Sequence, residues 1–240
     1  MLGPGRTIET EALVLKRTPY ADADWIVTLF TFSLGKVSAL APRARRSKHR
    51  FVGGLEAFHN LTVQLRSTRS EDLLQVTDGS ITRARHTLVL SLLAMQIAGK
   101  ALNWLRQAIP PRIVEPRAWS LVQSWLDIID AHPPIDPPQA DARLAEFGLR
   151  FLTVLGWSLE MSKCVRCGKP CPPRSSAYIN PSQGGVVCRD CGGTGQLVSS
   201  SLRKNMEQLS TFGTGELFAE HSDLALSVVE RTLESHAGID

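Results

Sequence analysis

The chain has 240 residues, of which 43% are hydrophobic, and 27 lysines and arginines against 23 acidic residues give it a net charge of +4. This hydrophobic fraction excludes wholesale disorder, and the length suits one large or two small domains. The longest charge-free run in the apolar middle, Thr87 to Gly99, is too short for the roughly 20 residues of a bilayer crossing. The N-terminus has no secretory signal pattern. We therefore expect a cytoplasmic chain without a membrane span, whose cysteines stay reduced.

Short segments rich in β-branched and aromatic residues fill the first eighty residues. We expect strands over Glu11–Thr18, Asp24–Thr31, Lys36–Ala41, Phe58–Arg66 and Leu73–Thr77. No helical stretch in this region is large enough to cover a sheet, and closure into a barrel removes the exposed edges of such strands. The sequence therefore predicts a small five-stranded barrel domain over residues 1–80.

From Ile81 onward the apolar residues recur at helical spacing. We expect helices over Thr87–Leu105, Glu115–Asp130, Ala140–Leu155, Ser199–Ser210 and Ser222–His236. The first of these should be buried, because leucines fill most of its circumference. We interpret the aromatic residues of these helices as core residues. The sequence thus predicts a helical domain over residues 81–240.

Two Cys-x-x-Cys pairs, Cys164–Cys167 and Cys188–Cys191, are separated by a stretch that is dense in Cys, Pro, Gly and Ser. Two such turns facing each other complete a tetrahedron of thiolates of the size that zinc prefers. Four sulfur ligands saturate the metal and leave no position for a catalytic water. We predict a structural Zn²⁺ held by Cys164, Cys167, Cys188 and Cys191 in an element over residues 162–195.

Three other interpretations of the cysteines remain open. A thioredoxin-type redox pair would sit in a βαβ unit, and none surrounds either pair. An iron–sulfur site is suggested by the run from Cys164 to Cys171, but its spacing differs from that of ferredoxins. Disulfides are disfavoured in a reducing compartment. In the zinc interpretation Cys171 is a spare thiol.

Positive charge is concentrated between Asp24 and Glu56, where no acidic residue intervenes. The six cations in this stretch are Lys36, Arg43, Arg45, Arg46, Lys48 and Arg50. They could form an ordinary solvated loop, but such dense like charges favour binding to an anion, and nucleic-acid phosphates are the obvious one. We predict that these six residues bind DNA, and that Tyr20 and Phe51, at the loop edges, stack on bases.

Signatures of catalysis are missing from the sequence. The six histidines accompany no nucleophile motif, and no Walker-type glycine-rich loop occurs. The carboxylates of Asp22 and Asp24 could hold a divalent cation, but two acids in a turn more often serve as a solvated turn or a cap. We therefore expect a protein that is not an enzyme.

Taken in order, these motifs resemble the bacterial RecO recombination-mediator family. The resemblance rests on the Ala12–Arg17 strand, the Tyr20–Thr31 segment, Arg43–Lys48, Phe151–Trp157 and the two cysteine pairs. It implies an α+β fold, with an N-terminal OB-fold β-barrel followed by an α-helical bundle and an inserted four-cysteine zinc element. It also implies a DNA repair and homologous recombination protein that binds single- and double-stranded DNA and anneals complementary strands.

The resemblance further implies partners. These are RecR and single-strand-binding protein, and indirectly the RecA recombinase, which such proteins help to load onto DNA; alone, the chain should be a nucleoid-associated monomer. A different class of function is a protein-interaction adaptor stapled by zinc, which would lose partner binding on mutation while staying normal on DNA. A zinc- or thiol-dependent enzyme is disfavoured by the closed ligand set.

Overall fold

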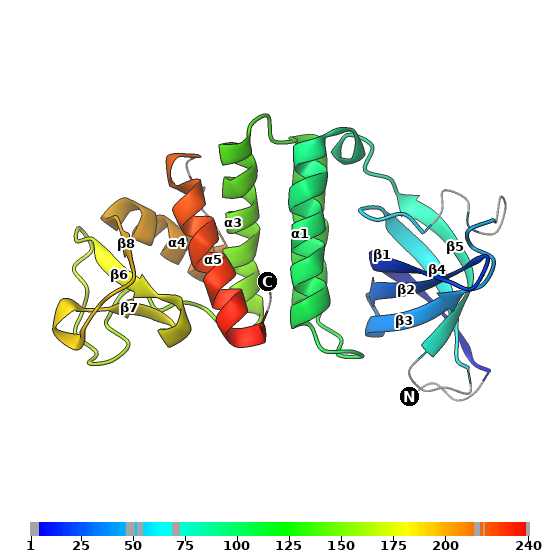
Figure 1. The fold of residues 1–240 in the computed structure, drawn as a ribbon, viewed down its shortest axis with the longest axis horizontal. Coiled ribbons are helices and arrows are strands. Elements are labelled where there is room, and N and C mark those ends of the chain that lie inside the picture. Colours follow the sequence, from blue (N-terminus) through cyan, green and yellow to red (C-terminus); the bar gives the residue numbers. More distant parts are fainter. Residues whose placement is uncertain are drawn as a thin grey trace. The chain divides into compact units, whose positions relative to one another are not determined.

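A computed structural model describes residues 5–46, 51, 55–68, 73–213, 217 and 219–238 of this α+β protein (Figure 1). The described residues fall into two compact units. The first lies within Met1–Ser91 and Leu105–Ala131, and the second within Leu92–Trp104 and His132–Asp240. The barrel domain predicted for residues 1–80 therefore lies inside the first unit. None of the helices in the described part of the chain is long and apolar enough to span a membrane.

The first unit is built on a closed barrel of five strands. They are β1 (Thr7–Tyr20), β2 (Asp24–Thr31), β3 (Gly35–Ala41), β4 (Asn60–Arg66) and β5 (Leu73–Arg83). Their order around the barrel is β1-β2-β3-β5-β4, and the β3–β5 pair alone is parallel. Every second residue of β3 is buried, as the pleat of a half-buried strand requires. The predicted five-stranded OB-fold barrel is confirmed.

Two details of the barrel differ from the sequence-based expectation. Strands β1 and β5 extend beyond their predicted ends, to Tyr20 and Arg83. Phe51, expected to be a stacking residue at a loop edge, is only 3% exposed and belongs to the apolar core of the barrel with Leu55 and Val63. This expectation for Phe51 was wrong, because an aromatic side chain that folds back into the barrel gains more from burial than from exposure to solvent.

Helix α2 (Pro116–Ala131) belongs to the first unit. Its Trp119 ring lies 5.6 Å from the ring of Phe30 in β2. Arg85, 1% exposed, donates to the carboxylate of Asp127 in α2 (2.8 Å) and to the carbonyl of Phe58 (2.6 Å). A buried guanidinium needs such partners, since an unpaired buried charge is costly. These contacts hold α2 to the segment that precedes β4 and to the segment that follows β5.

The second unit contains the first part of α1 (Leu92–Ala108), α3 (Pro137–Val154), α4 (Ser200–Phe212) and α5 (Ser222–Ala237). Helices α3 and α5 lie side by side (Figure 1), and they approach closely at Gly148, where a Cβ would lie 2.3 Å from Cγ1 of Val229. In α3, Phe147 stacks on Trp104 and Phe151. The expected packing of Val228, Val229 and Leu233 into this bundle is confirmed by their complete burial.

Two helix starts differ from the periodicity-based expectation. Helix α1 begins at Leu92 and not at Thr87, because Ser91 is extended (φ −102°, ψ 117°) and separates a short 3₁₀ turn, Leu88–Leu90, from the helix. Leu92, expected to be buried, is 66% exposed as a result. Helix α3 begins before the predicted Ala140, because the carboxylate of Asp136 accepts the N–H of Gln139 as an N-cap.

The expected cysteine-rich element forms a small antiparallel sheet in the second unit. Its strands are β6 (Ala177–Asn180), β7 (Gly185–Val187) and β8 (Gln196–Val198), in the order β7-β6-β8. Further 3₁₀ turns in the unit cover Pro181–Gln183, Arg189–Cys191 and Ala219–His221.

Candidate metal centre and nucleic-acid interface

Four cysteine sulfurs converge beside the small sheet. The Sγ atoms of Cys164, Cys167, Cys188 and Cys191 all lie within 4.8 Å of one another, and those of Cys167 and Cys188 are 3.7 Å apart. A tetrahedron with metal–sulfur bonds of about 2.3 Å has edges of about 3.8 Å. The arrangement therefore fits a tetrahedral metal ion with four thiolate ligands. The four-cysteine cluster predicted from spacing is confirmed as a site that could hold a metal ion.

Each Cys-x-x-Cys pair lies on a tight turn closed by glycine. Gly168 (φ +72°) donates its N–H to the carbonyl of Cys164 (2.9 Å), and Gly192 (φ +76°) follows the second pair. Both glycines have a left-handed backbone conformation, which glycine adopts without a steric penalty. The N–H of Cys188 points at the Sγ of Cys164 (3.4 Å), so the second turn stabilises negative charge on the first.

The pKa values of Cys164 and Cys191 are shifted in opposite directions. Backbone N–H groups of Cys188 and Cys167 lower the pKa of Cys164 to about 6. Hydrogen bonds with Cys188 and Cys167 raise the pKa of Cys191 to about 12. The cluster thus favours a thiolate at the buried Cys164 and a proton at Cys191. A bound cation would offset the repulsion of four adjacent thiolates. Cys171 lies outside this cluster, as expected of a spare thiol.

The cysteine-rich element packs through its backbone. A Cβ at Gly185, Gly193 or Gly195 would lie 2.3, 2.5 or 2.6 Å from the carbonyl oxygens of Glu160, Val187 and Ile179, respectively. Such approaches exclude every residue except glycine at these three positions.

A buried arginine that the sequence analysis missed holds this element to the helices. Arg203 of α4 is 4% exposed and donates to the carbonyls of Met161 (2.5 Å) and Pro172 (2.6 Å), on either side of the first cysteine turn. The sequence does hint at this role, because Arg203 is next to Leu202 and close to Met206 on the apolar side of the predicted helix. An arginine buried at such a position requires polar partners.

Three of the predicted DNA-binding residues follow the end of β3. Arg43, Arg45 and Arg46 are exposed, and the turn that carries them is fixed at its start by Asp24, whose carboxylate accepts the N–H of Arg43 (2.8 Å). The Asp24 carboxylate therefore orders the loop through its backbone. The Arg45 guanidinium in turn donates to the carbonyl of Asp22 (3.4 Å).

Two guanidinium groups lie near the ring of Trp25 on the barrel. The Cζ of Arg17 is 5.6 Å and that of Arg45 is 5.7 Å from the Trp25 ring centroid. Such distances suit cation–π attraction. Neither Arg17 nor Trp25 was singled out from the sequence, because only the pairing of β1 with β2, in which Trp25 lies opposite Pro19, brings them together. Tyr20, on the same strand as Arg17, is 52% exposed.

The other predicted DNA-binding residues are placed differently. Lys36 lies at the opposite end of β3 from the three arginines, and its Nζ donates to the carbonyl of Arg106 (2.5 Å). Burial and the neighbouring Arg106 charge lower the pKa of this amine. The structure therefore does not bring Lys36 together with the arginines. Lys48 and Arg50 lie outside the described residues.

Comparisons with known proteins cover nearly the whole chain. Residues 6–85 match the family model "Recombination protein O N terminal", and residues 91–239 match "Recombination protein O C terminal". The chain is 32% identical to the DNA repair protein RecO of Geobacter metallireducens, over 79% of this chain and 74% of the relative. It is 33% identical to that of Anaeromyxobacter sp. strain K, over 77% and 70% of the two chains. Geobacter sulfurreducens has a further relative, 32% identical over 88% of this chain and 83% of its own.

Proposed function

The chain belongs to the RecO family of recombination proteins, and we propose on that basis that it is a DNA-binding mediator of DNA repair. In this proposal it binds single- and double-stranded DNA and anneals complementary strands. Together with RecR it helps to load the RecA recombinase onto DNA coated with single-strand-binding protein. It carries out these tasks by binding alone, without catalysing a covalent reaction.

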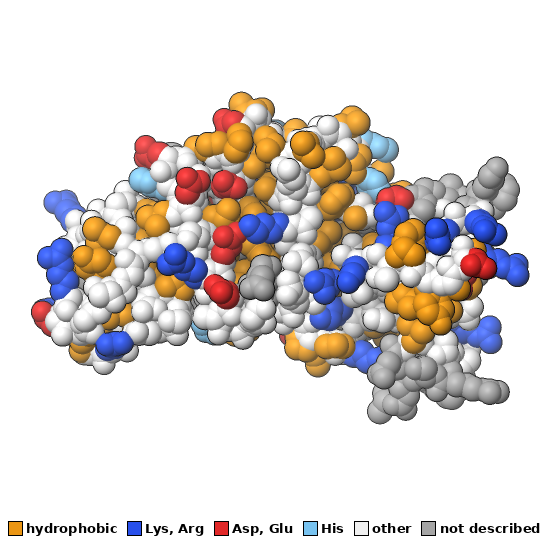
Figure 2. Space-filling view, viewed as in Figure 1, with side chains coloured by type: hydrophobic (Ala, Val, Ile, Leu, Met, Phe, Trp, Pro, Cys, Tyr) orange, Lys and Arg blue, Asp and Glu red, His pale blue; other side chains and the backbone are white. Residues whose placement is uncertain are grey.

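The observation that carries the proposal is the Trp25 ring of the closed barrel with the guanidinium groups of Arg17 and Arg45 beside it, close in sequence to the exposed Arg43 and Arg46. Barrels of this kind bind single strands by combining a cationic surface, which follows the phosphates, with aromatic rings that stack on bases. Lysine and arginine side chains stand out over the barrel unit in Figure 2. We include Lys48 and Arg50 of the same loop in the proposed DNA-binding surface.

We further propose that the metal is Zn²⁺ and that its role is structural. Four thiolates are the donor set of closed zinc sites, and they leave no coordination position for water or substrate. The sheet beside the cluster consists of strands of three or four residues, which bury little apolar surface on their own. Metal binding would therefore supply much of the folding free energy of this element.

Fluorescence anisotropy with a labelled oligonucleotide tests the DNA-binding proposal. We expect replacement of Arg43, Arg45, Arg46 and Lys48 by Ala to weaken binding. On single strands, the salt slope should flatten by up to about 0.7 for each phosphate that the variant no longer neutralises. Trp25→Ala should weaken binding by about 1–3 kcal/mol if one base stacks on the ring.

The matched control is Arg117→Ala, which removes an exposed arginine of α2 in the same unit and should leave affinity and slope unchanged. A quadruple variant with wild-type affinity and slope would refute the proposed surface. Annealing of two complementary oligonucleotides by the same proteins tests the mediator activity. A quadruple variant that anneals normally and fails only to capture RecR would indicate a protein-interaction adaptor instead.

A further inference from the structure

We propose that the sheet beside the metal cluster carries a second contact for single-stranded nucleic acid, centred on Tyr178 and Arg189. This inference rests on the proposed DNA binding and adds a site in the second unit, whereas the Trp25 site belongs to the first. Four observations carry it: the register of the small sheet, a cavity over its outer face, an arginine over the tyrosine ring, and the charge around the cavity.

The register of the sheet creates an apolar row on one face. Tyr178 of β6 lies opposite Val187 of β7 and Leu197 of β8, so these three side chains point to the same side. Among their neighbours along the strands, which point to the other side, Ala177, Ile179 and Val186 are buried. Leu197 nevertheless remains 52% exposed. The outer face of the sheet therefore presents apolar surface that the described part of the chain leaves partly uncovered.

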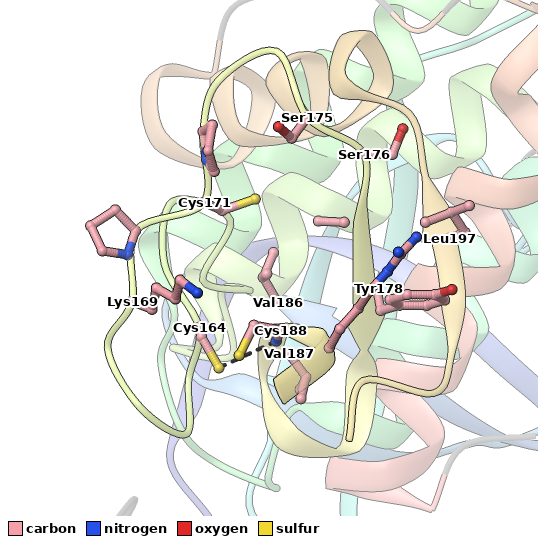
Figure 3. A pocket seen from close by; sticks show the side chains of 14 residues that line it. Cys164, Lys169, Cys171, Ser175, Ser176, Tyr178, Val186, Val187, Cys188 and Leu197 are labelled. Atoms are coloured by element: carbon pink, nitrogen blue, oxygen red, sulfur yellow. Dashed lines mark hydrogen bonds between the residues drawn. The ribbon is translucent and has the colours of Figure 1, made fainter. Parts of the chain in front are cut away.

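A cavity of about 410 Å³ lies over this row (Figure 3). It is lined by residues of the sheet, by the Pro170–Pro172 segment, and by Cys164 and Cys188. The volume falls within the range of roughly 300–1,000 Å³ that is typical of sites for small molecules. It is thus large enough for a planar group such as a nucleobase to enter beside Tyr178.

Arg189 lies over the Tyr178 ring, with its Cζ 6.0 Å from the ring centroid. Arg189 is exposed, and among the described residues its guanidinium has no carboxylate partner. The same pairing of arginine with an aromatic ring occurs at Trp25 in the barrel unit. A guanidinium next to a ring offers both a stacking surface and a positive charge, which is the combination that binds bases and phosphates of single strands.

The charge around the cavity favours an anionic occupant. Lys169 lines the cavity, and Arg174 lies in the turn closed by the hydrogen bond from the Ser175 N–H to the Pro172 carbonyl. Between Glu160 and Val198, five lysines and arginines stand against two acids, so the segment stays net positive even with the two negative charges of a divalent ion bound by four thiolates. Asp190, one of these acids, is already paired with Lys169 (3.1 Å).

A single strand suits this site better than a folded partner, because an aromatic ring, a guanidinium over it and a cavity of nucleobase size lie together. A base can enter the cavity while a flanking phosphate meets Arg189, whose guanidinium has no carboxylate partner among the described residues. Two contacts for single strands on one chain, one in each unit, would allow it to hold two strands at once. That is the physical requirement of the proposed annealing activity.

The test counts oligonucleotides bound to the full metal-loaded chain. An oligothymidine of about eight nucleotides, short enough to occupy one site, is titrated and its stoichiometry read by native mass spectrometry. We expect two oligonucleotides per wild-type chain and one for Tyr178→Ala, whose second binding event should be about 5- to 150-fold weaker. Tyr178→Phe keeps the ring and should bind two, and Arg189→Ala, at an exposed position, should repeat the defect without affecting metal content.

The possible outcomes separate this inference from the proposed function. If the wild-type chain binds one oligonucleotide, and Trp25→Ala alone abolishes it, the barrel site stands and the second site is refuted. If it binds none, both proposals fail. If Tyr178→Ala and Arg189→Ala bind two oligonucleotides normally but lose the capture of a partner protein, the cavity is a peptide site, and the nucleic-acid assignment is overturned.

Discussion

Replacing Arg203 by Met should loosen the metal-bearing element from α4. The guanidinium of Arg203 makes two buried hydrogen bonds, to the carbonyls of Met161 and Pro172. Hydrogen bonds to charged groups contribute about 1.5–3 kcal/mol each, so the pair contributes about 3–6 kcal/mol. The lower end of this range applies, because the Nε of Arg203 is buried without a hydrogen-bond partner among the described residues and offsets part of the gain.

We therefore expect Arg203→Met, which keeps an apolar stem of similar length, to lower the free energy of unfolding by about 3 kcal/mol. Urea unfolding of the metal-loaded protein measures this loss. Because Met161 and Pro172 flank the first cysteine turn, the variant should also release its metal faster to a chromogenic chelator.

Lys204→Met is the matched control, since Lys204 is the next residue of α4 and is exposed. It should change the free energy of unfolding by less than about 0.5 kcal/mol. If Arg203→Met and Lys204→Met unfold and release metal alike, the two carbonyl contacts do not hold the element, and the reasoning from buried hydrogen bonds is wrong.

Three further predictions concern the metal, helix packing and pH. Cys188→Ser should remove about one equivalent of zinc per chain, measured by elemental analysis, and a folded variant that retains it would contradict the ligand assignment. Gly148→Ala should lower the melting temperature, because its methyl group would overlap Val229, whereas Gly99→Ala, with open space around it, should leave it unchanged or raise it. Burial and the Arg85 charge lower the pKa of His59, which accepts the N–H of Arg85 at Nδ1 (3.0 Å). The stabilisation that depends on neutral His59 is thus fully present above the unfolded pKa of about 6.5 and is lost as the pH falls below it. Urea unfolding at several pH values measures this loss. If the urea midpoint of His59→Gln falls with pH as much as that of the wild type, His59 is not the cause.

The metal site and the barrel strands were predictable because each depends on a local pattern. Two Cys-x-x-Cys turns supply all four ligands of one site, whichever way the chain brings the turns together. In β3, polar and apolar residues alternate from Lys36 to Ala39, and this pattern identifies the buried face of the strand. Helix α1 was less predictable at its start, because leucines continue the helical period through Ser91 while the backbone there is extended. Periodicity records which residues are apolar, and it does not record where the backbone changes direction.

Contacts across strands or between distant segments explain the remaining misses. Arg17 and Trp25 meet only through the register of β1 on β2, and the sequence alone left that register open. Phe51 follows a run of cations and for that reason looked exposed, although it fills the barrel core. Arg203 meets its carbonyl partners 31 and 42 residues earlier in the chain, a separation that no local pattern reveals.

The glycines of the metal-bearing element have a consequence for how it tolerates mutation. Gly185, Gly193 and Gly195 sit against carbonyl oxygens at distances that no side chain permits. In most small domains, a saturation screen finds its intolerant positions among large apolar residues. Here we expect the glycines and the four cysteines to tolerate the fewest substitutions, while exposed positions such as Thr194 accept many. This element can therefore diverge widely in side-chain identity, and its lineage would be traced by the spacing of cysteine and glycine and not by hydrophobicity.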